Sequence, residues 1–212
     1  MDFQDFILRI PKMENELLLG ETAHQIMSPP ERLEIIKNLD IDTQNPRVAA
    51  VMMLFYPKNN KTHLVLIIRN TYPGVHSSQI AFPGGKSEAF DASLSATALR
   101  ETHEEIGIAP HQIQLIRPFT QLYIPPSNFM VYPYLGFSTS ELEFNPDPNE
   151  VAGIIELPLT EFLDEKNVIL RQMTTSYSVE IQVPTFNIQG HYVWGATAMI
   201  LSELKETLKM VL

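Results

Sequence analysis

Three glutamates within five residues are the side chains best suited to chemistry in this sequence. Glu101, Glu104 and Glu105 lie in a segment with a helical pattern. At 3.6 residues per turn, their carboxylates fall within an arc of about 100° on one helix face. Like charges at this spacing repel one another by roughly 0.2–0.5 kcal/mol per pair. A bound Mg²⁺ or Mn²⁺ would offset that repulsion, because carboxylate oxygens are preferred ligands of these ions. The alternative interpretation is an acidic helix face that is simply exposed to solvent.

The residues around the glutamates favour the metal site over the solvated face. Gly84 and Gly85 form a double glycine ahead of the helix, where a backbone without side chains can approach phosphate groups closely. Arg100 precedes the first glutamate and lies beside Glu104 on the helical wheel, so we expect it to orient that carboxylate rather than to touch substrate. Asp91, earlier in the same stretch, is either the N-cap of the helix or a partner of the metal or of Arg100.

The composition excludes several classes of function. The 212 residues include 44% hydrophobic side chains, which is enough for one domain with a buried core plus a terminal extension. The net charge of −10 argues against nucleic acid or an anionic membrane as a partner, since both bind clustered Lys and Arg. Without cysteine, disulfides and thiolate catalysis are excluded, and we expect a cytoplasmic protein. The first residues lack the basic start of a signal peptide, and no apolar stretch is long enough to span a bilayer.

Residues 1–43 are predicted to form a helical extension ahead of a main domain at residues 44–212. Apolar residues recur at helical spacing up to Ile10, and Pro11 is predicted to end that helix. Pro29 is predicted to open a second helix. These helices could cover a substrate cleft or form the surface of a homodimer.

The main domain is predicted to contain a mixed β-sheet with helices packed against it, an α/β (α+β) fold. Apolar runs predict a hairpin at residues 48–56 and 62–69, further strands at 113–124, 129–137 and 150–159, and an edge strand within 176–184. A final helix ends near Val211, and Trp194 is expected to pack in the core beneath it.

The segment from Gly85 to Ile108 resembles the Nudix box, a pattern of glycines, an arginine and glutamates at fixed spacing. The corresponding places are filled by Gly85, Arg100, Glu101, Glu104, Glu105, Gly107 and Ile108. Asp91 stands where the pattern has glutamate, with eight rather than seven residues before Arg100, and Thr102 stands at an aliphatic position. The resemblance implies a mixed sheet sandwiched between helices, Mg²⁺ or Mn²⁺ as cofactor, and hydrolysis of a nucleoside diphosphate linked to another moiety.

Flanking segments are similar to the coenzyme A pyrophosphatase branch of the Nudix hydrolases. The matching residues are Arg69-Asn70, Pro73-Gly74, His76, the run from Ser78 to Gly85, Phe129 to Phe137, and Val193 to Ala198. This resemblance implies that the substrate is bound by Arg69, His76, Gln79, Gly84 and Gly85. The alternatives are that Arg69 pairs with a nearby acid and that His76 is a structural or exposed loop residue. Gly74 and Ser78 depart from the arginine and glycine of that branch, so one arginine suited to phosphate is absent.

The resemblance also implies a division of roles among the acids. Glu101 and Glu105 would hold the metal, and Glu104 would add a ligand or a water-mediated contact. Glu104 is the first choice for the general base, and Glu150 is the second. Coenzyme A would yield phosphopantetheine and adenosine 3′,5′-bisphosphate. A hydrolase for ADP-ribose, NADH or another dinucleotide is the alternative, and a non-catalytic nucleotide-binding module is a remoter one.

Overall fold

A long antiparallel hairpin forms the centre of the molecule. The computed structural model describes residues 1–70, 79–174 and 180–212. Strands β1 (Arg47–Lys58) and β2 (Lys61–Arg69) pair antiparallel, as the sequence predicted, and both residues of the connecting turn, Asn59 and Asn60, have left-handed backbone angles. Asparagine tolerates this conformation better than most residues, which suits the tight turn.

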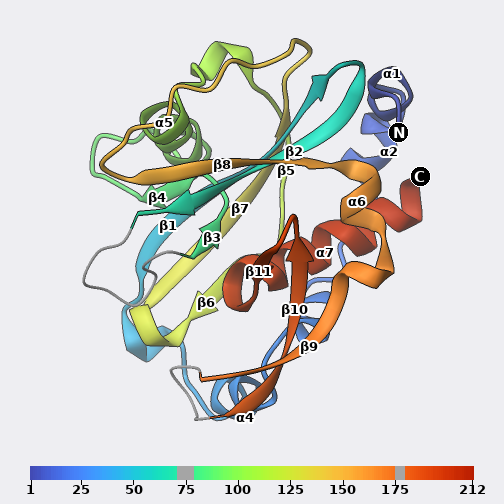
Figure 1. Cartoon of the computed structure of the whole chain (residues 1–212). Coiled ribbons are helices and arrows are strands. Elements are labelled where there is room, and N and C mark those ends of the chain that lie inside the picture. Colours follow the sequence, from blue (N-terminus) through green and yellow to red (C-terminus); the bar gives the residue numbers. More distant parts are fainter. Residues whose placement is uncertain (71–78, 175–179) are drawn as a thin grey trace.

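The hairpin belongs to an eight-stranded mixed sheet (Figure 1). Its only parallel pair among the described residues joins β1 to β7 (Phe129–Phe137). The other strands of this sheet are β3 (Ile80–Ala81), β4 (Gly84–Lys86), β5 (Gln114–Pro118), β6 (Leu122–Ile124) and β8 (Val151–Pro158). The predicted single strand at 113–124 is thus two strands, β5 and β6, which pair with different parts of β7.

The two faces of this sheet are covered by different helices. Along β1, Met52 and Leu54 pack into the core beneath α5 (Leu94–Ile106), whereas Met53 and Phe55 pack into the core that contains α7 (Gly195–Val211). This alternation follows from the two-residue period of a strand. The predicted mixed sheet between helices is therefore confirmed.

The N-terminal segment forms more helices than the sequence pattern predicted. It contains α1 (Phe3–Ile7), α2 (Ile10–Asn15), α3 (Glu21–Ile26), α4 (Pro30–Lys37) and the 3₁₀ turn η1 (Asp42–Gln44). Pro11 does not end a helix but lies in the first turn of α2, where a missing backbone N–H costs nothing. Phe3, Phe6 and Met13 are buried in the same core as α7.

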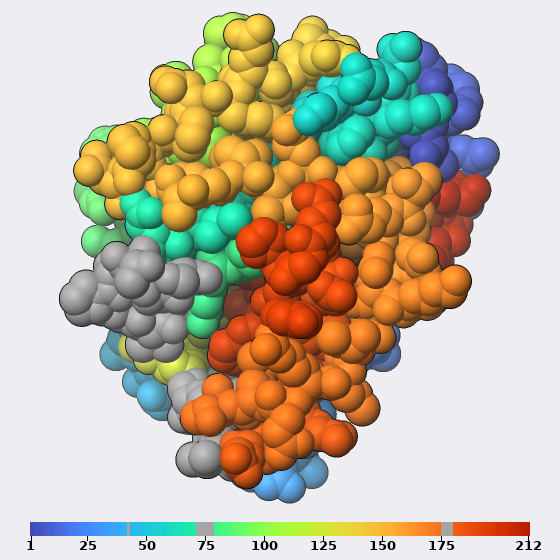
Figure 2. Space-filling view, in the orientation of Figure 1, coloured from blue at the N-terminus to red at the C-terminus, as the bar shows by residue number. Residues whose placement is uncertain are grey.

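A second sheet of three strands lies outside α7. It comprises β9 (Val168–Met173), β10 (Ile181–Ile188) and β11 (His191–Val193), after the short helix α6 (Leu159–Leu163). The predicted edge strand at 176–184 lies partly outside the described residues, and its described part belongs to the middle strand of this sheet. Figure 1 shows these strands in front of α7, and in Figure 2 they form part of the orange and red surface. Within the described ranges, every helix is too short or too polar to cross a membrane.

Candidate active site

The double glycine places backbone directly against two of the three glutamates. Gly84 pairs with Val51 of β1 and has φ +153°, and its N–H donates to Glu105 Oε2 at 2.8 Å. A side chain at this position would collide with the backbone of β1. A Cβ on Gly85 would overlap the carboxylate of Glu101. The backbone of β1 therefore requires glycine at position 84, whereas a side chain at position 85 would displace the Glu101 carboxylate.

Helix α5 presents the acids because its two ends are fixed. Ser93 is the N-cap, and its hydroxyl accepts a hydrogen bond from the N–H of Ala96 at 3.1 Å. Gly107 ends the helix in a left-handed conformation at φ +78°. Thr102, which occupies the aliphatic position of the box, is fully buried and donates its hydroxyl to the carbonyl of Ala98 at 2.6 Å, so it packs without an unsatisfied polar group.

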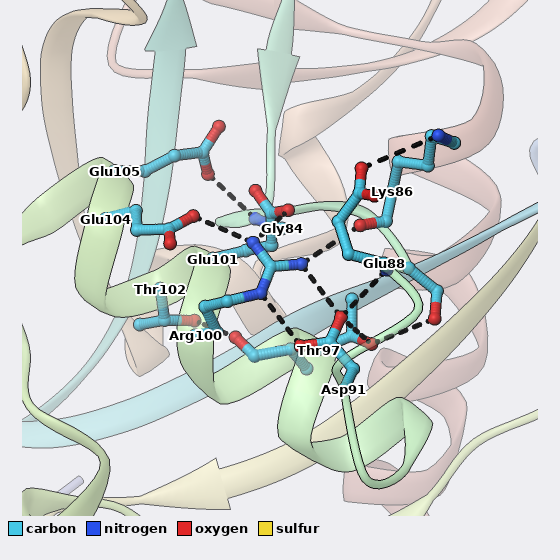
Figure 3. Close-up of polar contacts among 12 residues, drawn as sticks. Gly84, Lys86, Glu88, Asp91, Thr97, Arg100, Glu101, Thr102, Glu104 and Glu105 are labelled. Carbon is cyan, nitrogen blue, oxygen red and sulfur yellow. Dashed lines mark hydrogen bonds and ion pairs between the residues drawn. The ribbon is translucent and has the colours of Figure 1, made fainter.

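Arg100 lies at the centre of the carboxylates (Figure 3). Its Nη1 donates to Glu101 Oε1 at 2.7 Å and to Glu104 Oε2 at 2.8 Å. Its Nε and Nη2 each donate to one oxygen of Asp91 at 2.9 Å, a bidentate pair. The N-cap alternative for Asp91 is wrong, because Ser93 caps the helix, and Asp91 is instead paired with Arg100. A link between Asp91 and the metal stays a prediction. Arg100 in turn fixes Glu101 and Glu104.

Burial perturbs the acids next to the glycines. Glu105 is 1% exposed, and burial raises its pKa to about 8, although the N–H of Gly84 and the charge of Arg69 act in the opposite direction. Arg69 Nη1 lies 3.6 Å from Glu105 Oε1. Burial also raises the pKa of Glu101 above its usual value against the opposing effect of Arg100. Two neighbouring carboxylates are therefore short of positive charge.

This shortage fits a divalent cation. Glu101 and Glu105 supply hard oxygen donors beside the glycine turn, and Glu104 extends from the same helix with 55% of its side chain exposed. Across residues 1–70, 79–174 and 180–212, no three acidic or histidine side chains already converge as metal ligands. The Glu101 and Glu104 carboxylates instead accept hydrogen bonds from Arg100, and the Glu105 carboxylate accepts one from the Gly84 N–H.

Glu150 approaches the same acids from another element. It lies just before β8, its carbonyl accepts a hydrogen bond from Asn70 N at 2.9 Å at the end of β2, and it is exposed. Its negative charge is among the causes that raise the pKa of Glu101 and of Glu105. The structure thus brings Glu150 near the carboxylate cluster, as the sequence alone could not establish.

A cavity of about 620 Å³ opens beside the glycine turn. Four of the predicted substrate-binding residues line it, namely Arg69, Gln79, Gly84 and Gly85. The fifth, His76, lies outside the described residues, as do Gly74 and Ser78. Apolar side chains form most of the remaining wall, as is usual for small-molecule sites.

Three lining residues were missed by sequence reasoning. Lys86 follows the glycines, Arg32 comes from α4, and Trp194 precedes α7. The expected core position of Trp194 is wrong, because the side chain is only half-buried and faces the cavity. Nothing in the spacing of these residues indicates that they meet, since they lie in three distant segments.

Comparisons with known proteins identify the class. A profile of the NUDIX domain matches residues 46–177. The "Uncharacterized Nudix hydrolase NudL" of Enterobacter sp. (strain 638) is 33% identical over 174 residues, which cover 77% of this chain and 83% of the relative. "Nudix hydrolase 15, mitochondrial" of Arabidopsis thaliana is 31% identical over 192 residues, which cover 85% of this chain and 66% of the relative. The chain therefore belongs to the Nudix hydrolases and is an enzyme of the pyrophosphatase class.

Solved structures agree on the fold. The Nudix hydrolase RenU from M. smegmatis matches with a TM-score of 0.54 at 14% identity, over 79% of this chain and 88% of that protein. A MutT/nudix family protein from Enterococcus faecalis matches with a TM-score of 0.52 at 16% identity, over 88% of this chain and 72% of that protein. At these identities the likeness establishes the mixed α/β architecture and nothing about substrate.

Proposed function

We propose that this protein hydrolyses the pyrophosphate bond of a nucleoside diphosphate derivative, with coenzyme A or its thioesters as the leading substrate and Mg²⁺ or Mn²⁺ as cofactor. The observation that carries the proposal is the position of Glu101 and Glu105 on the double glycine, at the edge of a cavity whose charged lining residues, within the described part of the chain, are all basic. Such a lining suits an anionic ligand, and the acids suit a metal bound to its phosphates.

The residues of the chain would divide the work as follows. Glu101, Glu105 and Glu104 would hold the metal, which when bound neutralises pyrophosphate charge and acidifies a water. The backbone of the glycine turn lets phosphate oxygens come close, and Arg69 lies where it can share a phosphate with the metal site. Arg100 keeps Glu101 and Glu104 in place through its own bidentate contact with Asp91.

Glu104 is our first choice for the base that accepts a proton from the attacking water. It is the most exposed of the three box acids, and it is held by one hydrogen bond from Arg100 at 2.8 Å. Glu150 is the second choice, because it is exposed and its charge acts on Glu101 and Glu105. Replacing each by Gln separates the two, since the true base should lose kcat by about a hundredfold or more.

Coenzyme A is favoured by the resemblance in the segments around the box. Arg69 and Gln79 belong to that resemblance and line the cavity. The departures at Gly74 and Ser78 favour the alternative, a hydrolase for ADP-ribose, NADH or another dinucleotide. A nucleotide-binding module without catalysis is disfavoured by the intact box glutamates.

A substrate panel decides between these functions. The protein would be incubated with Mg²⁺ or Mn²⁺ and coenzyme A, ADP-ribose, NADH or a dinucleoside polyphosphate, and the products separated by chromatography. Phosphopantetheine from coenzyme A is the expected product. If another compound were cleaved while coenzyme A stayed intact, coenzyme A would be rejected as the substrate and only the assignment to the pyrophosphatase class would remain.

The metal site is tested by Glu105→Gln, which keeps a hydrogen-bond acceptor for the Gly84 N–H but removes the charge. We expect turnover to fall by at least about a hundredfold, and chelation of metal to abolish it in the unmodified protein. The matched control is Glu143→Gln, an exposed acid in the segment after β7, which should leave turnover unchanged. Undiminished turnover in Glu105→Gln would contradict the assignment.

A further inference from the structure

Arg32 is a buried cation in the wall of the substrate cavity that the proposed chemistry at the glycine turn does not use. It belongs to α4, it is 7% exposed, and its Nη2 donates to the carbonyl of Tyr123 at 2.8 Å. Burying a guanidinium is costly unless its donors are engaged. Arg32 nevertheless lines the cavity, so it can contact a ligand there as well as hold β6 through Tyr123.

Ser127 lines the same cavity and has an unsatisfied hydroxyl. Among the described residues, its Oγ is buried and has no hydrogen-bond partner, and the residue lines the cavity. Buried polar atoms without partners are rare in folded proteins and commonly mark a place where a ligand or water binds. Ser127 thus supplies a donor that fits an oxygen-rich group.

The segment that carries Ser127 is held rigidly. The Nη2 of Arg47 donates to the carbonyl of Ser127 at 2.8 Å, and Asn128 Nδ2 donates to the carbonyl of Gln44 at 3.0 Å. These bonds join the turn η3 (Pro125–Ser127) and the residue after it to the end of η1 and the start of β1. The wall is therefore pre-organised, which reduces the entropy lost on binding.

The charged side chains that line the described part of the cavity all have the same sign. Its charged lining residues in the described chain are Arg32, Arg69 and Lys86, although the protein as a whole has 25 acidic and 15 basic residues. Arg69 contacts Glu105, and Lys86 follows the glycine turn, so both belong to the pyrophosphate end. Arg32 comes from a different element. The cavity therefore has more basic positions than the pyrophosphate alone needs.

We propose that Arg32 and Ser127 bind a second anionic group of the substrate, a phosphate monoester separate from the pyrophosphate. The inference rests on the proposed function, because it takes the glycine turn as the pyrophosphate end. A planar guanidinium can bind two phosphate oxygens and a serine hydroxyl a third. The cavity volume of about 620 Å³ is sufficient for a nucleotide derivative. In this proposal Arg32 helps to determine which substrate is bound, although it lies outside residues 46–177, which the NUDIX profile matches.

The test compares coenzyme A with dephospho-coenzyme A, which has the same pyrophosphate but lacks the 3′-phosphate. We expect the unmodified protein to have a kcat/KM for coenzyme A about tenfold to a hundredfold higher than for dephospho-coenzyme A, mainly through KM. In Arg32→Met this ratio should collapse toward one. Arg32→Lys should give an intermediate ratio, because a lysine keeps the charge but not the fork. Ser127→Ala should lower the ratio by a smaller factor.

Arg117→Met is the matched control. Arg117 also joins the sheet to the N-terminal helices through carbonyl contacts, donating to Met13 O and Glu16 O, but it does not line the cavity. Its loss should leave the substrate ratio unchanged. Melting temperatures of all variants would show whether Arg32→Met still folds. If Arg32→Met does not fold, the substrate ratio of Ser127→Ala decides the test.

A binding measurement separates failure of this inference from failure of the proposed function. Calorimetry with adenosine 3′,5′-bisphosphate and with AMP should show about tenfold tighter binding of the bisphosphate, and Arg32→Met should lose that difference. If neither coenzyme is cleaved, the proposed function fails while this measurement still decides the role of Arg32. An unchanged preference in Arg32→Met and Ser127→Ala, or no preference in the unmodified protein, overturns the inference.

Discussion

At the scale of single residues, the site depends on the absence of a side chain at Gly85. A Cβ there would overlap the carboxylate of Glu101, so Gly85→Ala must displace a proposed metal ligand. We expect kcat/KM to fall by about a hundredfold, with a small change in melting temperature. Gly153→Ala in β8 is a matched control, because its Cβ would meet only the flexible end of Ile68 at 3.2 Å. Equal activity of both variants would contradict this account.

Asp91 gives a second prediction at this scale, because an effect on the carboxylates can be measured separately from an effect on folding. As the bidentate partner of Arg100, it should affect the carboxylates through the guanidinium. Asp91→Asn should therefore weaken activation by Mg²⁺ by about tenfold to a hundredfold, measured as the metal concentration for half-maximal rate.

Ser93→Ala serves as the comparison for Asp91→Asn. It removes the true N-cap and should cost about 1 kcal/mol of stability without a matching loss of metal activation. If the two variants behaved alike, the contribution of Asp91 would be to stability and not to the metal site.

Helical pitch was enough to predict that Glu101, Glu104 and Glu105 share one side of a helix. It could not predict that Arg100 binds Glu101 as well as Glu104, since that contact depends on a side-chain rotamer. The role of Asp91 was equally undetermined, because the loop before α5 has no periodic pattern. Local geometry is thus predictable from spacing only inside regular elements.

At the scale of elements, the hydrophobic pattern predicted the long strands and the long final helix but not the short strands and the contacts between distant elements. The hairpin β1–β2 and the final helix were predicted because their apolar runs are long. The split into β5 and β6, the small outer sheet, and the contact of α4 with β6 depend on tertiary packing. The cavity is built from these unpredicted contacts, which is why Arg32 was not found in the sequence.

Glu203 connects three elements and gives the third prediction. It is fully buried in α7 and accepts hydrogen bonds from Gly20 N at 3.0 Å, Thr120 Oγ1 at 2.6 Å and His24 at 3.3 Å. Glu203→Gln should lower the free energy of unfolding at pH 7 by about 3 kcal/mol, because buried donors lose a charged acceptor. Glu206→Gln, one turn further along α7 and bonded to Lys209, should cost less than about 1 kcal/mol.

The pH dependence of this effect has a defined sign. Burial raises the pKa of Glu203, but the hydrogen bonds from His24 and Thr120 outweigh it and leave the pKa below its usual value of 4.5. The stabilisation is therefore present above pH 4.5 and is lost as the pH falls through the lower pKa of the folded state. Urea titrations should show the two proteins converging in stability at acid pH. A constant difference from pH 7 to pH 3 would contradict this.

At the scale of the whole molecule, the N-terminal segment shares the core of the enzyme. The match to the NUDIX profile begins at residue 46. We propose that residues 1–43 are an extension that precedes the Nudix domain in the sequence. Its side chains nevertheless lie in the core that contains α7, and Arg9 and Lys12 donate to carbonyls near the C-terminus. Figure 1 shows both chain ends side by side. This arrangement lets α4 bring Arg32 to the cavity.

The last prediction asks whether this segment unfolds together with the sheet. Phe6 is fully buried, and its ring lies 4.8 Å from that of Phe55 in β1. Phe6→Ala should therefore cost about 3–5 kcal/mol of unfolding free energy. Leu8→Ala, in the same segment but 77% exposed, should change it by no more than about 0.5 kcal/mol. We expect a single urea transition for both variants, monitored by the fluorescence of Trp194 and by circular dichroism. A separate early transition in Phe6→Ala, with the main one unmoved, would mean that the helices fold apart from the sheet and do not fix Arg32.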